Sequence, residues 1–255
     1  MPPVFQKNML GAIDAAAAAA KVLQVSPDVP CMVGAIGLST AQRGRITRLN
    51  ISGADMMGTN ATFPMSALQR GSQTWECNYV GAPMYPGTAS FSMACTLDAA
   101  GQASARLYVD PIPPELQAKI NENPGVCQID ENFLLGMGEI TVAAAGVNIP
   151  LTTTLKRDVR GWYRFILDTL TVPAINDLVL TSLNLCGTEN NNQMTSPMSV
   201  LDFHPDATSK LGGLYFINGK AGAPLTALLS NNSAGGIVIG GGFIRAFPGM
   251  GWAKS

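Results

Sequence analysis

The chain contains two similar segments: residues 49–68 read LNISGADMMGTNATFPMSAL, and residues 183–201 read LNLCGTENNNQMTSPMSVL. In both, a strand-like Leu-Asn-aliphatic run meets a Gly that permits a turn, and a polar loop leads to Pro-Met-Ser. The match predicts an internal duplication, with chance similarity in a chain rich in Ala, Gly, Ser and Thr as the alternative. With one gap, eight positions are identical: Leu49/Leu183, Asn50/Asn184, Gly53/Gly187, Thr62/Thr195, Pro64/Pro197, Met65/Met198, Ser66/Ser199 and Leu68/Leu201.

Short runs with period-two alternation surround both copies and predict about twelve strands, which favours sandwiches or barrels over βαβ units. One predicted strand precedes each copy and three follow it. A Gly-Ala-Pro tripeptide also follows each copy, at 81–83 and 222–224. The predicted strands cover residues 31–39, 45–51, 73–80, 88–97, 104–109, 139–145, 148–155, 159–172, 178–185, 214–217, 223–229 and 236–246.

Two helices are predicted. The Ala15–Ala20 run has the strongest helix propensity in the chain, and the prolines at 27 and 30 would end it, so a helix is expected over residues 7–24. A short surface helix is expected over residues 114–123, because Pro114 and Glu115 suit a first turn and Pro124 blocks extension.

The predicted fold is therefore mainly β, with two tandem antiparallel β-sandwiches, an N-terminal helix and a short helix between the units. The expected domains are an N-terminal helical arm at 1–30, a first β-sandwich at 31–156 that includes the connecting helix 114–123, and a second β-sandwich at 157–255.

Charge is scarce. Lys, Arg, Asp and Glu make up 13% of the 255 residues, about half of the roughly 25% usual for a soluble domain. With a formal net charge of −1, the chain has no overall positive potential that would attract nucleic acid or an anionic membrane. Much of the surface is thus expected to be neutral polar or covered by a partner.

No uninterrupted apolar stretch of 18 residues predicts a transmembrane helix, and Asp14 and Lys21 interrupt the one stretch that resembles a secretory signal, at 9–23. The five cysteines, Cys31, Cys77, Cys95, Cys127 and Cys186, form no C-x-x-C pair. They are expected to be buried thiols in a reducing compartment rather than disulfide or zinc ligands.

Motifs that could carry chemistry each have a structural interpretation. His204, the only histidine, lies in Asp202-Phe-His-Pro-Asp206, whose spacing fits a turn better than a metal site or a nucleophile with a His base. Gly240-Gly241-Gly242 follows a strand but lacks the Lys-Ser/Thr of a phosphate loop, so a bulge or close backbone approach is expected. No catalytic, cofactor-binding or metal-binding residue is predicted, and no cofactor.

The segment Arg157–Phe165 (RDVRGWYRF) interleaves basic and aromatic residues, as a single-stranded nucleic-acid site would. Alternation instead favours a sandwich strand with Val159, Tyr163 and Phe165 on one face and Arg160, Trp162 and Arg164 on the other. The loops at 55–62 and 189–193 are equivalent in the two copies, and contact with neighbours or merely loop length would explain them equally well.

Taken together, the arm at 1–24, the duplicated segments 49–68 and 183–201, and the strands around each resemble the double jelly-roll major capsid proteins of membrane-containing tailless bacteriophages. The resemblance is architectural, without a family-specific motif. It implies two eight-stranded jelly rolls, a pseudo-hexagonal homotrimer in an icosahedral virion capsid, synthesis in the host cytoplasm, and an arm near an internal membrane or an adjacent capsomer. About twelve predicted strands fall short of the sixteen that it implies.

The sequence therefore predicts a structural virion protein and not an enzyme. Its expected partner is itself, in a homotrimer and in lateral capsomer contacts, with other virion proteins and an internal lipid membrane contacted through the arm, and with no sequence-specific nucleic-acid binding. The alternative is a carbohydrate-binding or adhesin-like β-sandwich module that uses exposed aromatic residues such as Trp75, Trp162 or Trp252.

Overall fold

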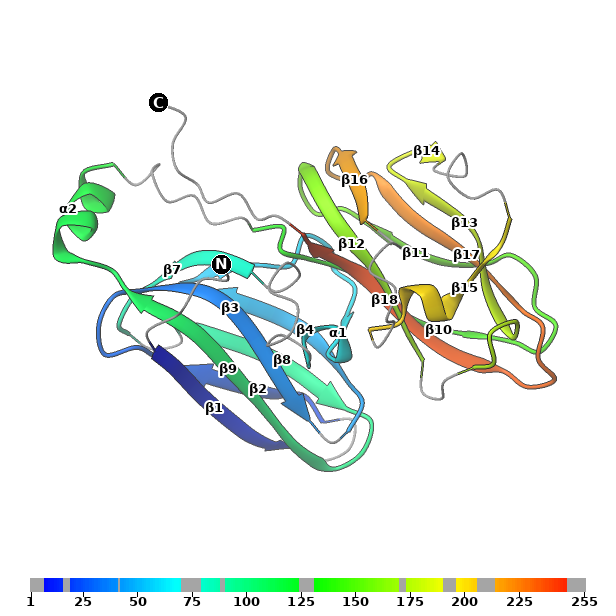
Figure 1. Ribbon diagram of the computed structural model, residues 1–255, viewed down its shortest axis with the longest axis horizontal. Helices are drawn as coiled ribbons and strands as arrows, with labels where there is room; N and C mark the ends of the chain where they lie inside the picture. Colours follow the sequence, from blue (N-terminus) through cyan, green and yellow to red (C-terminus); the bar gives the residue numbers. More distant parts are fainter. Residues whose placement is uncertain are drawn as a thin grey trace. The chain divides into compact units, whose positions relative to one another are not determined.

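A computed structural model of the chain describes residues 7–15, 19–40, 42–69, 79–87, 90–123, 131–169, 173–189, 196–205 and 214–246. The chain divides into two compact units (Figure 1). Unit 1 contains residues 1–57, 68–133 and 245–255, and unit 2 contains residues 58–67 and 134–244.

The main strands of unit 1 form two antiparallel sheets. One sheet has the order β1-β9-β3-β7, and the other has the order β2-β8-β4-β5. The strands are β1 (Lys7–Ala15), β2 (Lys21–Val25), β3 (Cys31–Thr40), β4 (Gly44–Ile51), β5 (Ala54–Asp55), β7 (Tyr79–Met84), β8 (Phe91–Leu97) and β9 (Gly101–Pro111).

Unit 2 repeats this arrangement, with one sheet in the order β10-β18-β12-β16 and the other in the order β11-β17-β13-β14. The short β15 pairs with β13. The strands are β10 (Leu134–Val142), β11 (Ile149–Thr154), β12 (Val159–Thr169), β13 (Leu178–Leu185), β14 (Thr188–Glu189), β15 (Met198–Ser199), β16 (Leu214–Gly219), β17 (Pro224–Asn231) and β18 (Ile237–Arg245).

The remaining described elements are short. They are β6 (Phe63–Pro64), the helix α1 (Ser66–Gln69), the helix α2 (Pro114–Glu122) and the 3-10 helix η3 (Val200–Phe203). The predicted helix at 114–123 is confirmed as α2, which has Pro114 at its first position and Glu115 in its first turn. No described helix is long and apolar enough to cross a membrane.

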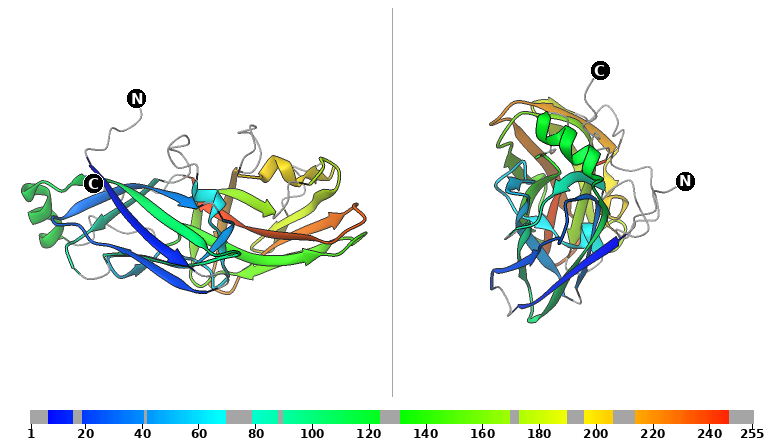
Figure 2. Two further views of the ribbon diagram at one scale, coloured as in Figure 1. Left: turned by 90° about the horizontal axis from the view of Figure 1, so that it is seen from below. Right: turned by 90° about the vertical axis from the view of Figure 1, so that its left-hand side faces the viewer.

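Both units are jelly rolls. When the main strands of a unit are numbered one to eight along the chain, the two sheets have the orders 1-8-3-6 and 2-7-4-5 in unit 1 and again in unit 2. The chain alternates between two facing layers, as in a double-sheet jelly roll (Figure 2). The predicted fold of two tandem antiparallel sandwiches is confirmed, and sixteen main strands replace the predicted twelve.

The inner faces of the sheets form the cores. In unit 2 one continuous apolar cluster joins residues of both sheets, among them Leu135, Leu151, Phe165, Leu183 and Phe243, each no more than 1% exposed. In unit 1 the buried residues include Leu23, Ile36, Leu49, Phe91 and Leu107, all fully buried. Burial of these alternating residues is the main force that holds each pair of layers together.

The predicted N-terminal helix over residues 7–24 is wrong. Residues 7–15 form β1, which pairs with β9 from Lys7 opposite Val109 to Ala15 opposite Gly101, and residues 21–25 form β2, which pairs with β8. Leu23 is fully buried between exposed Val22 and Gln24, an alternation typical of a strand. Long-range strand pairing therefore overrides helix propensity at residues 7–15 and 21–25, which belong to the first jelly roll rather than to an arm, whereas residues 16–18 lie outside the described part of the chain.

The domain limits also differ from those predicted. β10 and β11, placed by the sequence in a first sandwich ending at residue 156, are strands of unit 2, which also includes residues 58–67. The reason is that β10 pairs with β18, the last strand that the structure describes, over eight residue pairs. Strand composition does not reveal such a distant partner.

The two similar segments occupy equivalent positions in the two jelly rolls. Each forms the fourth strand, a two-residue turn and the short fifth strand. The turn residues have positive φ in both copies: 49° at Ser52 and 85° at Gly53, 58° at Cys186 and 85° at Gly187. This pattern defines a type I′ hairpin, so the repeated Gly is explained by backbone geometry. The Gly-Ala-Pro tripeptides, in contrast, lie in the sixth strand of unit 1 and at the start of the seventh strand of unit 2.

The Gly187→Ala substitution tests the role of this turn. A Cβ at Gly187 meets no atom within 4 Å, so the loss arises from the φ of 85° alone. We expect the free energy of unfolding of unit 2 to fall by about 1–2 kcal/mol, measured by urea denaturation.

Gly235→Ala is the matched control, because a Cβ there also meets nothing within 4 Å and its φ lies outside the left-handed region. Equal losses for the two variants would contradict the assignment of backbone strain to Gly187.

Candidate functional site

The interleaved basic and aromatic segment forms β12, as alternation predicts. Val159, Tyr163 and Phe165 are buried in the core of unit 2, whereas Arg160 and Trp162 are exposed. Phe165 stacks on Phe243, with ring centroids 4.7 Å apart, and lies 5.4 Å from Phe203. Tyr163 and Phe165 thus pack in the core, whereas Trp162 is available for contacts at the surface.

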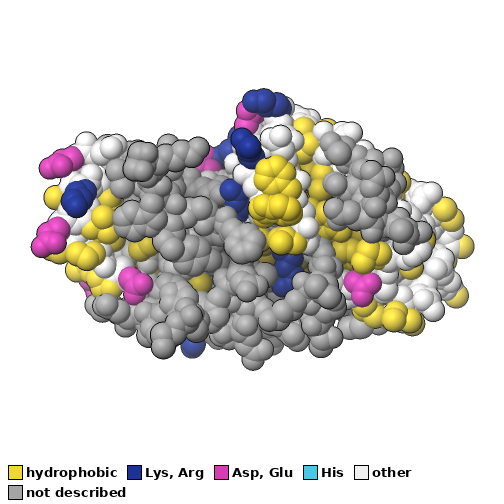
Figure 3. Space-filling model, turned by 45° about the horizontal axis from the view of Figure 1, so that its top comes forward, with side chains coloured by type: hydrophobic (Ala, Val, Ile, Leu, Met, Phe, Trp, Pro, Cys, Tyr) yellow, Lys and Arg dark blue, Asp and Glu magenta, His cyan; other side chains and the backbone are white. Residues whose placement is uncertain are grey.

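An aromatic patch, defined as Trp162, Phe216 and Leu214, covers the outer face of β12 and β16. Trp162 is directly opposite Phe216 in the strand pair, and their ring centroids are 5.3 Å apart at an angle of 60°. The three side chains are 47%, 43% and 45% exposed. Figure 3 shows hydrophobic side chains gathered on this face of unit 2, with Lys and Arg side chains around them.

Charged residues surround this patch. Arg164 is opposite Leu214, and Arg160 is opposite Asn218. Just before β12, Asp158 accepts a hydrogen bond of 2.7 Å from the ammonium group of Lys220. That hydrogen bond lowers the pKa of Asp158 and raises the pKa of Lys220. The apolar centre is thus bordered by cations, an arrangement typical of protein interfaces, where Trp, Phe and Arg are enriched.

Among the side chains that the structure describes, the sixth strand of unit 1 has no exposed apolar pair like that of β16. In β7, Gly81 is partly buried and Pro83 is buried, whereas the equivalent strand β16 presents the exposed Leu214 and Phe216. β16 is also the last strand in the order of its sheet. The two jelly rolls share a fold but differ on this surface, and Phe216 was not singled out from the sequence.

His204 lies just after the 3-10 helix η3 and is 8% exposed. Its Nε2 is 3.6 Å from the carboxylate of Asp168 in β12, which is 4% exposed. Asp206 lies outside the described residues, and those that are described contain no group of three His, Cys, Asp or Glu residues able to hold a metal ion. The geometry matches a residue packed at a turn, as the sequence predicts.

Gly240, Gly241 and Gly242 lie within β18, opposite an irregularity of β10 between Gly136 and Gly138. The predicted bulge or close backbone approach is confirmed. A Cβ at Gly242 would lie 2.6 Å from the Phe63 ring, and one at Gly136 would collide with the carbonyl oxygens of Ala61 and Thr62.

Residues 58–63 of unit 2 pack directly against these glycines. The Thr59 hydroxyl donates to the Gly136 carbonyl at 2.7 Å, and the Gly138 N–H donates to the Thr62 carbonyl at 3.0 Å. Thr59 is fully buried. Of the two interpretations left open for the loop at 55–62, contact with neighbours or solvent does not apply to Met56–Thr59, which are buried, and residues 190–193 of its counterpart lie outside the described residues.

The described cysteines are Cys31, Cys95 and Cys186. Cys31 and Cys95 are buried and Cys186 is partly buried, whereas Cys77 and Cys127 lie outside the described residues. Burial raises the pKa of the Cys95 and Cys186 thiols, which keeps them protonated at neutral pH. Trp75 and Trp252, two of the three candidate sugar-binding aromatics, also lie outside the described residues.

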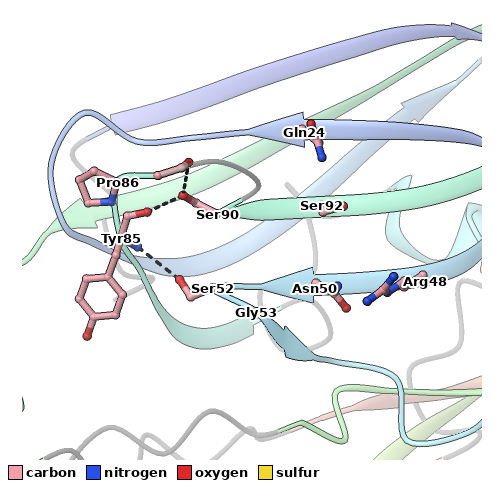
Figure 4. Close-up of a pocket in the computed structure, with 10 residues that line it drawn as sticks. Gln24, Arg48, Asn50, Ser52, Gly53, Tyr85, Pro86, Ser90 and Ser92 are labelled. Carbon is pink, nitrogen blue, oxygen red and sulfur yellow. Dashed lines mark hydrogen bonds between the residues drawn. The ribbon is translucent and has the colours of Figure 1, made fainter.

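A polar groove of about 520 Å³ opens on the outer face of unit 1 (Figure 4). Its floor comes from the three neighbouring strands β2, β8 and β4, and its end from the turn after β7. No sequence motif predicts it, because its residues are spread over three strands and the turns beside them. The lining residues are Gln24, Arg48, Asn50, Ser52, Gly53, Tyr85, Pro86, Gly87, Ser90 and Ser92.

Searches of protein-family models and of curated proteins find no match to this chain. Among solved structures, the crystal structure of the STIV MCP, a major capsid protein, is similar over 92% of this chain and 97% of that chain, with 10% sequence identity and a TM-score of 0.38. The jelly-roll assignment rests on the strand order of each unit.

The Gly136→Ala substitution tests the packing of residues 58–63 against the glycines. The added Cβ would press on backbone carbonyls, which cannot rotate away as a flexible side chain can. We expect the free energy of unfolding of unit 2 to fall by about 3 kcal/mol or more, measured by denaturant titration.

The control is Gly236→Ala, where the nearest atom is the Thr141 methyl at 3.5 Å, an ordinary contact. If the Gly136→Ala and Gly236→Ala variants had equal free energies of unfolding, residues 58–63 could not pack directly against the glycines.

Proposed function

We propose that this chain is a structural subunit that associates with copies of itself to build a viral capsid. The observation that carries the proposal is the presence of two complete jelly rolls in tandem, with the same strand order and the same type I′ hairpin in each. Jelly rolls recur in capsid and lectin domains. A tandem pair lets each subunit supply two similar building units to a lattice.

The composition supports this role. A charged fraction of 13% leaves few groups to keep a free monomer in solution. Obligate interfaces resemble a hydrophobic core cut in half, so a subunit that buries much of its surface against copies of itself tolerates such a composition.

The aromatic patch is the surface best suited to self-association. Trp162 in β12 is adjacent to Phe216 and Leu214 in β16, the strand at the end of the sheet, and each of the three side chains is nearly half exposed. Exposed apolar edge strands favour pairing with another chain. The finer features of the proposal are a pseudo-hexagonal homotrimer, lateral contacts between capsomers, contacts with other virion proteins, and a place in the virion shell after synthesis in the host cytoplasm. Contact with an internal membrane through a helical arm is not part of it, because residues 7–15 and 21–25 are jelly-roll strands.

The alternative, a carbohydrate-binding module that uses Trp162, has less support. Sugar rings stack on an open aromatic face, whereas the Trp162 ring meets Phe216 at 60° with 5.3 Å between centroids. An apolar cluster of this kind is typical of the centre of a protein interface.

The test is the mass of the purified protein in solution. Light scattering should give a multiple of 26.7 kDa, with a trimer as the smallest stable species. The double substitution Trp162→Ser with Phe216→Ser should lower this mass and leave circular dichroism unchanged, because both side chains are exposed.

Val147→Ser with Ile175→Ser is the matched control, since it removes two exposed apolar side chains of unit 2, 71% and 64% exposed, outside the aromatic patch. It should leave the mass unchanged. A wild-type protein that stays at 26.7 kDa at every concentration would overturn the proposal.

A further inference from the structure

The floor of the polar groove in unit 1 is a row of side chains across three strands. Gln24 in β2 is directly opposite Ser92 in β8, and Ser92 is directly opposite Asn50 in β4. Residues opposite one another lie on the same face of a sheet, so two amides and a hydroxyl point outward side by side. Figure 4 shows this row with Arg48 beside Asn50.

These polar groups are open to a ligand. Within the described part of the chain, neither the Gln24 amide nor the Ser92 hydroxyl has a hydrogen-bond partner. Amide and hydroxyl groups both donate and accept, as do the hydroxyl groups of a saccharide. The row therefore suits a polyhydroxylated ligand better than an apolar one.

In the equivalent row of unit 2, two of the polar side chains bond each other. Thr152, Thr226 and Asn184 take the places of Gln24, Ser92 and Asn50 in the strand register. There the Thr152 hydroxyl donates to the Thr226 hydroxyl at 3.0 Å, so these groups satisfy each other. The duplication thus provides an internal comparison in which only unit 1 has an open row.

Arg48 gives the groove a positive charge. It is the only Lys, Arg, Asp, Glu or His among the residues that line the groove. With the Asn50 amide oriented to satisfy both of its atoms, its oxygen accepts from Arg48 Nε at 3.1 Å and from Nη2 at 3.2 Å. These contacts hold the guanidinium in place and leave three of its five N–H donors for an anion.

The end of the groove is rigid. The Ser90 hydroxyl, 4% exposed as a residue, lies within hydrogen-bond distance of the carbonyls of Tyr85 and Gly87, and the Ser52 hydroxyl accepts from the Tyr85 N–H at 3.3 Å. The Gly87 N–H donates to the Ser26 hydroxyl at 3.2 Å. Tyr85 and Pro86 are therefore held as an apolar wall, and this preorganisation reduces the entropic cost of binding.

From these features we propose that the polar groove binds a saccharide that carries a carboxylate group. The Arg48 guanidinium would bind the carboxylate, the row of Gln24, Ser92 and Asn50 would bind hydroxyl groups, and the Tyr85–Pro86 wall would contact the C–H face of a sugar ring. A volume of about 520 Å³ lies within the range usual for small-molecule sites. This site is separate from the aromatic patch and goes beyond the structural role proposed above.

The experiment is a calorimetric titration of the full chain with two matched probes, a galacturonic acid oligosaccharide and the corresponding galactose oligosaccharide. The acidic probe should bind at least about tenfold more tightly than the neutral one, because a charge-assisted pair with Arg48 is worth about one such factor. Arg48→Gln should abolish this difference in affinity, and Ser92→Ala should weaken the binding of both probes.

Arg106→Gln is the charge-matched control. It removes one exposed arginine of β9, in the other sheet of unit 1 and outside both the polar groove and the aromatic patch, and should leave binding unchanged. Absence of saturable binding, equal affinity for both probes, or equal weakening by Arg48→Gln and Arg106→Gln would each overturn the proposal. The mass of the assembly should be the same in all of these variants, so failure here is distinguishable from failure of the capsid role.

Discussion

Pairing between the first and the eighth strand of each unit is the interaction on which the rest of the structure depends. In unit 1 this pair is β1 with β9, and in unit 2 it is β10 with β18. Each pair joins the two ends of a unit, so the chain between them must fold back in both layers. Closing such long loops is costly in entropy, and burial of the alternating apolar residues between the sheets offsets that cost. The short hairpins and the surface features follow from this arrangement.

Local features were predictable from the sequence. Most strands, the helix α2 and the Gly of each repeated turn follow from alternation, Pro placement and the need for positive φ, all of which act over a few residues. The alternation of β12 likewise placed Trp162 outside and Tyr163 inside. The prediction of a helix at 7–24 was wrong because β1 and β2 pair with strands within residues 91–109, which are distant in the chain. Alanine propensity carries no information about such partners.

The candidate sites show the same limit. Trp162 could be named from the sequence, but its partner Phe216 comes from a strand more than fifty residues later. The row of Gln24, Ser92 and Asn50 exists only in the strand register, and Gln, Ser and Asn are unremarkable residues in sequence. The difference between the open row of unit 1 and the closed row of unit 2 becomes visible only when equivalent strands are compared.

The scarcity of charge is consistent with a subunit that hides surface against copies of itself. Electron cryo-microscopy of the purified protein tests this account most directly, because it displays the fold and the assembly together. We expect closed assemblies in which each 26.7 kDa subunit contributes two similar β-sandwich lobes. Images that contain only separate monomers, or subunits with a single lobe, would contradict it.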